Sequence, residues 1–262
     1  MKNNLETHSY FNVSFSGRFN SNQVKINWEP TPRTLPFAFR EKIDQFWENE
    51  IAGSPKHAHI FNGPLCRLNR WEIHESYVTL SLGLTDYKEL LHSNHFTDAI
   101  EKEFGSPSLS KALGVSAVLL THDEQIMLMK RSEAVGEDPG KIDVFGGHIH
   151  PTEHAVAGVP DPFHAIKTEI LEEANLRLMT NDLVVCIGLI ETTHTKKPEL
   201  IFEVTSRRRA QDIIASASQS TEWSTIFAIS AKKDPLLSFL KEHSDHISSS
   251  ALGALWLHAI EY

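Results

Sequence analysis

The sequence has little cysteine, no long hydrophobic run and no excess of positive charge. Its 262 residues include two cysteines, Cys66 and Cys186, too few for a disulfide framework and compatible with a reducing compartment. Apolar runs such as residues 117–120 are far shorter than the roughly 18–20 residues that cross a bilayer. The polar start of the chain lacks the apolar core of a signal peptide. These absences predict a soluble protein of the cytoplasm, or also of the nucleus.

The charge of the chain is unevenly distributed. The 25 basic and 34 acidic side chains give a formal net charge of -9, of which residues 1–113 contribute -1 and residues 114–262 contribute -8. The segment 133–173 alone holds nine acids and two bases. Without a basic face, nucleic-acid binding is not expected. A cluster of acids is either a solvated surface or a site for a hard cation, and the spacing of the acids has to decide.

Strand and helix patterns alternate in mixed order along the chain, which predicts an α/β or α+β fold. In the first part we expect strands within the first ~30 residues, a helix over 39–51, a hairpin over 65–83, and a helix that begins at Asp86 and is capped by Thr85. A serine-rich connector then suggests a boundary. We therefore predict an N-terminal α/β domain over residues 1–113 and a second domain over 114–262.

The second domain is expected to contain both strands and helices. The predicted strands cover residues 115–121, 125–130, 142–145, 183–191, 199–205 and 224–229, and the predicted helices cover 161–174, 207–217, 236–243 and 250–258. A polar loop over 132–141 precedes the third strand, and Gly146 and Gly147 directly follow that strand.

The helix predicted over 161–174 carries three carboxylates on one face. At about 100° per residue, Glu169, Glu172 and Glu173 lie together beside an apolar stripe that would dock the helix. Asp161 is a suitable N-cap and Asn175 a suitable left-handed end. Like charges within one turn repel each other, and Mg²⁺ or Mn²⁺ would reverse the sign of that interaction. The alternative interpretation is a solvated helix face.

The sequence around this helix resembles a known signature. Residues 168–176 are TEILEEANL, and five residues separate Gly147 from Glu153. This pattern resembles that of the Nudix hydrolases: Gly, five residues, Glu, seven residues, then Arg-Glu-U-x-Glu-Glu-x-Gly-U, where U is aliphatic. Three departures are present, since Thr168 replaces the arginine, Asn175 replaces the last glycine, and 14 residues rather than seven follow Glu153.

An interrupted signature of this kind resembles the divergent Nudix branch that hydrolyses UDP-glucose and UDP-galactose. The shared segments are Phe61-Asn62-Gly63, Gly83-Leu84-Thr85-Asp86-Tyr87, Gly147-His148-Ile149-His150-Pro151, and Glu169 through Asn175-Leu176. The resemblance covers most of the chain. It implies a Nudix fold, with a mixed sheet sandwiched between helices, and Mg²⁺-dependent hydrolysis of a UDP-sugar to UMP and a sugar 1-phosphate.

The resemblance also implies which residues act. Glu169, Glu172 and Glu173 are the candidate catalytic residues and metal ligands, and the general base among them is left open. The backbone of Gly147, or of Gly146, is a further candidate ligand, since glycine lets the chain approach a metal closely. Glu222 could be a late metal ligand or base, with an ordinary loop acid as the alternative.

The candidate substrate contacts each have a structural alternative. Asn62 could instead shape its turn and Tyr87 could pack in the core, whereas Lys130, Arg131 and His148 could simply be solvated. The expected partner is a small nucleotide sugar, without nucleic acid or membrane, and the oligomeric state is left open. Two rivals remain: a Nudix hydrolase of another diphosphate, such as a dinucleotide or coenzyme A, and a non-catalytic nucleotide-binding module. The missing arginine favours the module, and the three retained glutamates argue against it.

Overall fold

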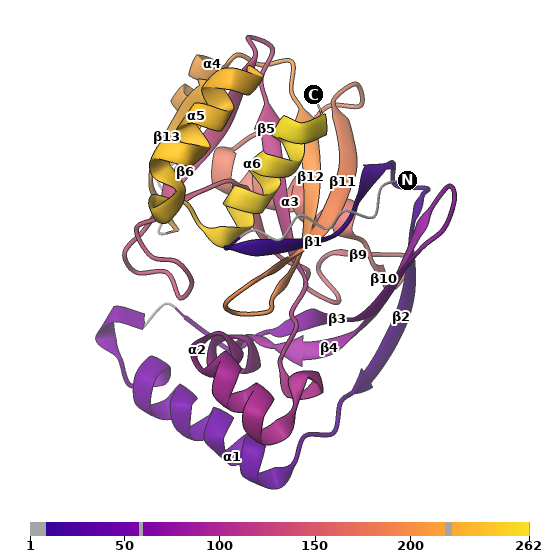
Figure 1. Ribbon diagram of the computed structural model, residues 1–262, viewed down its shortest axis with the longest axis vertical. Helices are drawn as coiled ribbons and strands as arrows, with labels where there is room; N and C mark the ends of the chain where they lie inside the picture. Colours follow the sequence, from indigo (N-terminus) through magenta and orange to yellow (C-terminus); the bar gives the residue numbers. More distant parts are fainter. Residues whose placement is uncertain (1–8, 58–59, 218–221, 262) are drawn as a thin grey trace.

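A mixed sheet of eight strands forms the centre of the larger part of the molecule. The computed structural model describes residues 9–57, 60–217 and 222–261 (Figure 1). The strands run in the order β1-β11-β12-β5-β6-β13, with β7 paired to β6 and β8 paired to β5. Their bounds are Phe11–Phe19 (β1), Gly114–Leu120 (β5), Gln125–Arg131 (β6), Ile142–Asp143 (β7), Phe145–His148 (β8), Leu183–Thr192 (β11), Pro198–Thr205 (β12) and Trp223–Ser230 (β13). The β12–β5 pair is parallel and its neighbours are antiparallel, which confirms the expected mixed sheet.

Helices cover both faces of this sheet. α3 (Pro162–Ala174) and α4 (Ala210–Ser216) pack on one face, and α5 (Lys233–His243) and α6 (Ser249–Glu261) pack on the other (Figure 1). Alternation along β5 explains this arrangement, because Val115 and Ala117 pack with α3 and Val118 packs with α6. The expected α+β class, with a sheet between helices, is confirmed. In the described ranges, no helix is long and apolar enough to cross a membrane.

A smaller three-stranded sheet lies in the N-terminal part. β2 (Val24–Pro32) pairs parallel to β4 (Val78–Asp86), and β3 (Pro64–Ile73) pairs antiparallel to it, so the expected hairpin is confirmed. α1 (Phe37–Phe46) continues into a π-helical turn over Trp47–Ala52 and packs against α2 (Tyr87–Phe104). Short 3-10 turns occupy Pro55–His57, Ser106–Ser108 and Ser244–His246.

The cap of α2 differs from the prediction. Asp86 is the N-cap, since its side chain accepts a hydrogen bond from the Glu89 backbone N–H. Thr85 instead donates its hydroxyl to the Glu89 carboxylate at 2.7 Å. Asp and Thr are both good caps, and the aspartate is the residue that directly precedes the first helical turn.

One strand lies on the other side of the predicted boundary at residues 113 and 114. β1 pairs with β11 in the large sheet, although it precedes the small sheet in sequence. Its residues Phe11 and Val13 pack with α6, and Phe15 and Phe19 pack in the core on the opposite face. The register of β1 shifts between Val13 and Phe15, so its apolar residues are buried on both faces of the larger sheet. The division into two domains otherwise stays a prediction.

Candidate functional site

The local sequence fixes where α3 begins and ends. Asp161 Oδ1 accepts the backbone N–H groups of Phe163 at 2.8 Å and His164 at 3.3 Å, which confirms the predicted N-cap. Asn175 has φ 49° and ψ 37°, the left-handed conformation expected at the helix end. The apolar stripe, which includes Ile166 and Ile170, is buried against the large sheet. The opposite face of the helix therefore points its carboxylates along the sheet.

A small hairpin accounts for the longer gap before α3. β9 (Ala155–Val156) and β10 (Val159–Pro160) pair antiparallel within the stretch that follows Glu153. His154 is buried at the base of this hairpin, where its Nδ1 accepts the His150 N–H at 3.0 Å. The extra residues are thus accommodated before the helix cap, and the helix itself is uninterrupted.

The glycine pair at the end of β8 allows the helix carboxylates to approach the sheet. Glu173 is buried and accepts the Gly146 N–H at 3.0 Å. The Glu169 carboxylate lies against Gly147, where a Cβ atom would collide with it. A Cβ on Gly146 would collide with the Val115 carbonyl of β5. A larger residue at Gly147 would therefore push the Glu169 carboxylate away from the sheet, and one at Gly146 would disturb the pairing of β8 with β5.

The pKa values of all three helix carboxylates are raised above their ordinary value. Burial raises the pKa of Glu169 to about 8, helped by the charges of Glu172 and Glu222. Burial and then the charge of Glu169 raise the pKa of Glu173 well above its ordinary value, against the opposing Gly146 N–H. The pKa of Glu172 is raised by burial and by Glu222. A positive charge among these groups would favour their ionised forms.

These carboxylates line a cavity of about 560 Å³ between the two parts of the chain. Ile60, Phe61, Gly63 and Tyr87 contribute from the N-terminal part. Eight of the ten predicted site residues line the cavity, namely Tyr87, Arg131, Gly147, His148, Glu169, Glu172, Glu173 and Glu222. Its size and mixed polar lining are suitable for a small-molecule ligand.

The other two predicted contacts, Asn62 and Lys130, lie outside the cavity lining. Asn62 Oδ1 accepts the Lys88 backbone N–H at 2.9 Å, so its contact is with the first turn of α2. Lys130 is exposed on β6, and its carbonyl accepts the Ser224 hydroxyl at 3.2 Å. These positions agree with the alternative interpretations, in which Asn62 shapes its turn and Lys130 is solvated.

The donor chemistry of the cavity suits a hard divalent cation, although the carboxylates are not gathered around a single point. Within residues 9–57, 60–217 and 222–261, no group of three or more His, Cys, Asp or Glu side chains is close enough to hold a metal ion. The acids of α3 nevertheless present only oxygen donors, as Mg²⁺ prefers. Their mutual repulsion, shown by the raised pKa values of Glu169 and Glu173, is what a bound cation would relieve.

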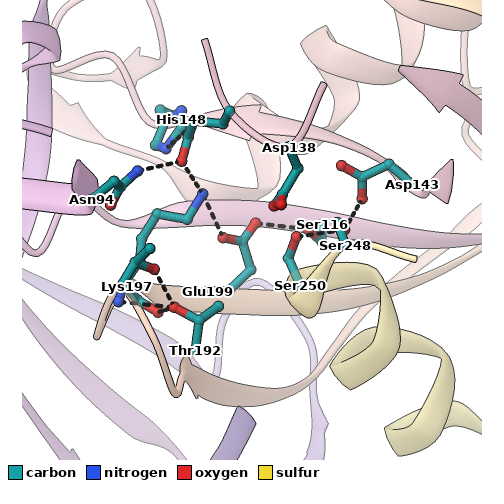
Figure 2. Close-up of polar contacts among 12 residues, drawn as sticks. Asn94, Ser116, Asp138, Asp143, His148, Thr192, Lys197, Glu199, Ser248 and Ser250 are labelled. Carbon is teal, nitrogen blue, oxygen red and sulfur yellow. Dashed lines mark hydrogen bonds and ion pairs between the residues drawn. The ribbon is translucent and has the colours of Figure 1, made fainter. Parts of the chain in front are cut away.

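A second polar group at the cavity was missed from the sequence. Lys197 Nζ lies 3.0 Å from Glu137 Oε1 and 3.6 Å from Glu199 Oε2, and the Ser116 hydroxyl donates to Glu199 Oε1 at 2.6 Å (Figure 2). The available signal was Glu199 itself, a charged residue within the apolar strand 198–204, PELIFEV. Burial raises the pKa of Glu199 to about 6, although Lys197 opposes that shift.

Comparison with known proteins gives sequence relatives that are named as pyrophosphatases or Nudix hydrolases. No family model matches the chain. Mouse and human proteins named uridine diphosphate glucose pyrophosphatase NUDT22 are each 29% identical to it, over 66% and 64% of this chain. Nudix hydrolase 9 of Arabidopsis thaliana is 24% identical over 73% of this chain and 72% of its own length. The chain spans 63% of the length of the mouse and human relatives.

Among solved structures, the chain is similar to the MutT protein from Methanosarcina mazei Go1. The identity is 16%, the match covers 57% of this chain and 94% of that chain, and the TM-score is 0.41. The assignment rests instead on the sequence relatives and on the glutamates of α3 beside the Gly146-Gly147 pair. On these grounds the chain is similar to divergent Nudix hydrolases, and among them it resembles the proteins named for activity on uridine diphosphate glucose.

Proposed function

We propose that this protein hydrolyses the diphosphate bond of UDP-glucose or UDP-galactose and releases UMP and a sugar 1-phosphate. The observation that carries the proposal is the set of acids that one helix, α3, presents to a cavity beside a glycine pair. Relatives that share 29% identity are named for activity on uridine diphosphate glucose. The cavity volume of about 560 Å³ is within the range of small-molecule sites.

The proposed cofactor is Mg²⁺, with Mn²⁺ as a substitute. Glu169, Glu172 and Glu173 would hold it, with the Gly147 backbone and Glu222 as further ligands. A bound divalent ion supplies positive charge for the phosphates, polarises a phosphoryl oxygen and makes water more acidic. This charge is needed because residues 114–262 have a net charge of -8 and the substrate is itself an anion.

The chain's own groups would move a proton and position the substrate. A water oxygen attacks one phosphorus, the bridging P–O bond breaks, and the departing phosphate keeps the bridging oxygen. Glu169 is our candidate for the group that takes the water proton, because its carboxylate lies in the cavity against Gly147 and a bound cation would favour its ionised form. Arg131 and Tyr87, which line the same cavity, are candidates for contacts with the phosphates and the nucleoside.

The direct test incubates purified protein with UDP-glucose and UDP-galactose, with and without Mg²⁺, and measures UMP by chromatography. We expect Mg²⁺-dependent release of UMP together with an equal amount of sugar 1-phosphate. Glu133→Gln is a matched control, since Glu133 is exposed and lies outside the cavity lining. Absence of UMP from both substrates contradicts the proposal, and cleavage of a dinucleotide or coenzyme A instead assigns another diphosphate.

The non-catalytic alternative has one structural observation in its favour. The acids lining the cavity do not form a group that could hold a metal ion, in the part of the chain that is described. Thr168, in place of the signature arginine, donates its hydroxyl to the His164 carbonyl within α3. Thermal stabilisation by UDP with Mg²⁺, without any product, would identify a binding module.

Location and partners are part of the same proposal. Both cysteines, Cys66 and Cys186, are free and buried, as a reducing compartment requires. We therefore propose the cytoplasm, or also the nucleus, as the site of action. The net charge of -9 supports a small-molecule partner rather than a nucleic acid.

A further inference from the structure

A side chain of the protein itself fills one corner of the cavity. Glu137 belongs to the loop 132–141, and its Oε1 accepts Asn94 Nδ2 at 2.8 Å and Lys197 Nζ at 3.0 Å. His148 Nε2 lies 3.5 Å from the other oxygen, Oε2. Asn94, His148 and Lys197 point toward one another around this position (Figure 2). The carboxylate thus accepts hydrogen bonds from two nitrogen groups and lies close to a third.

These three nitrogen groups come from three separate elements, and none belongs to the loop. Asn94 lies on α2, His148 ends β8, and Lys197 directly precedes β12. The side chains of Lys197 and His148 are 13% and 14% exposed. His148 Nε2 makes no hydrogen bond to any described atom and is directed at the carboxylate. The scaffold therefore forms a cradle for an anion independently of the loop that now fills it.

The loop that carries Glu137 has few other ties to the scaffold. Residues 132–141 contain no helix or strand, and Gly140 adopts the positive φ of 72°. Arg131 Nε donates to the Glu137 carbonyl at 3.0 Å, a contact that fixes the backbone at the same residue. Residues 135–138 line the cavity. Removal of the Glu137 carboxylate from the cradle would break its bonds to Asn94 and Lys197, and the loop can move once the Arg131 bond and the packing of Gly136 against Tyr87 also give way.

We propose that Asn94, His148 and Lys197 form an anion subsite for a phosphate group of the substrate, and that Glu137 occupies it until the substrate arrives. This inference rests on the proposed function, because it requires a substrate that carries phosphate. Carboxylate and phosphate oxygens accept the same charge-assisted hydrogen bonds, so one can replace the other. The loop moves aside when the exchange takes place.

The charges around the cradle favour the replacement of the Glu137 carboxylate by a phosphate group. Lys197 lies between two carboxylates, Glu137 and Glu199, while Arg131 is paired with Asp143 at 2.9 Å. Removing Glu137 leaves two cations and two carboxylates in this group, so an incoming anion no longer meets an excess of negative charge. Within this group, the carboxylate of Glu137 is thus both the occupant of the cradle and the source of the excess negative charge.

The test measures binding of inorganic pyrophosphate by calorimetry in EDTA, so that neither metal nor turnover is involved. Glu137→Gln should tighten binding at least tenfold, because a charged competitor becomes a neutral one. Glu133→Gln, in the same loop but exposed, should leave binding unchanged. Lys197→Met added to Glu137→Gln should remove the gain. Unchanged or weaker binding by a folded Glu137→Gln variant overturns the inference.

A second measurement uses the natural chain and does not depend on a variant that folds. Pyrophosphate should speed amide hydrogen exchange in residues 133–140, because it releases the loop, and unchanged or slower exchange contradicts this. The two proposals fail separately. A protein that binds pyrophosphate as expected but cleaves no UDP-sugar keeps the subsite, whereas an active enzyme without these effects keeps only the proposed function.

Discussion

Glu203 of β12 and Glu169 of α3 have opposite electrostatics, although burial acts to raise the pKa of both. Glu203 of β12 accepts His258 Nδ1 at 2.9 Å and Arg18 Nη2 at 2.7 Å. Burial alone would raise its pKa, but these two partners outweigh burial and lower the pKa to about 2. Glu169 of α3 faces other carboxylates instead, and burial raises its pKa to about 8.

The difference shows that the partners of a buried acid, rather than its burial, distinguish an acid that stabilises the fold from one that serves a functional site. Glu203 joins β12 to β1 through Arg18 and to α6 through His258, so its charge holds three elements together. The acids of α3 lie together along one cavity, where a chain built for stability alone would place a cation. The following predictions test this contrast, beginning with the largest expected effect.

Glu172→Gln and Glu173→Gln should each lower the turnover of a UDP-sugar by roughly 100- to 10,000-fold. The amide keeps the shape of the side chain but loses the negative charge proposed to hold Mg²⁺. Folding should survive, because the pKa of Glu173 is raised well above its ordinary value and a neutral group suits that position. Steady-state kinetics and thermal unfolding check this, and a natural turnover rate in both variants would move the active site elsewhere.

Glu203→Gln should show the reverse pattern. We expect a loss of about 2 kcal/mol in the free energy of unfolding, because a buried charge-assisted hydrogen bond is weakened. Turnover per folded molecule should stay within twofold, since Glu203 is not part of the cavity lining. Denaturant unfolding with parallel kinetics measures both effects. A stable variant with reduced turnover would erase the distinction between the two sets of acids.

The stability of the metal-free protein should decline as pH rises because of Glu169. A carboxyl whose folded pKa is about 8, above its ordinary value of 4.5, stabilises the fold fully below pH 4.5 and loses that contribution as pH approaches 8. After allowance for solvent screening, the decline is on the order of 1–2 kcal/mol.

Unfolding is measured in EDTA between pH 5 and pH 8, roughly the range of maximal stability. At the acidic end, the natural chain and Glu169→Gln should have the same free energy of unfolding. The variant should become the more stable of the two at the alkaline end. Mg²⁺ should restore the natural chain selectively at high pH, where its carboxylates are ionised. Parallel curves for the two proteins, with or without Mg²⁺, would contradict the assignment of Glu169.

The parts of this contrast that depend on local sequence could be predicted, and those that depend on long-range pairing could not. The limits of α3 follow from Asp161, Asn175 and the apolar stripe between them, all within one segment. The pairing of β1 with β11 joins residues about 170 positions apart, and alternation alone does not choose a partner strand.

The site divides in the same way. The acids of α3 were predicted because helical spacing places them on one face, and the cavity lining agrees for Glu169, Glu172 and Glu173. The cradle of Asn94, His148 and Lys197 comes from three separate elements, so no spacing in the sequence connects them. Asn62 and Lys130 lie outside the cavity lining, because a turn motif and a strand end do not fix which way a side chain points, and their roles stay predictions.

The smallest expected effect comes from the N-cap of α3, which lies at the opposite end of the helix from Glu172 and Glu173. Asp161→Ala removes the acceptor for the Phe163 and His164 N–H groups and should cost about 1 kcal/mol of unfolding free energy. Asp161→Ser is the matched control, because a serine hydroxyl restores the cap. Turnover should be unchanged in both, since Glu173 is held at the other end of the helix, by Gly146 through its carboxylate and by Trp223 Nε1 through its carbonyl. A fall in turnover that Asp161→Ser reverses would show that the cap positions the acids, and that the active face of α3 depends on stability at its first turn.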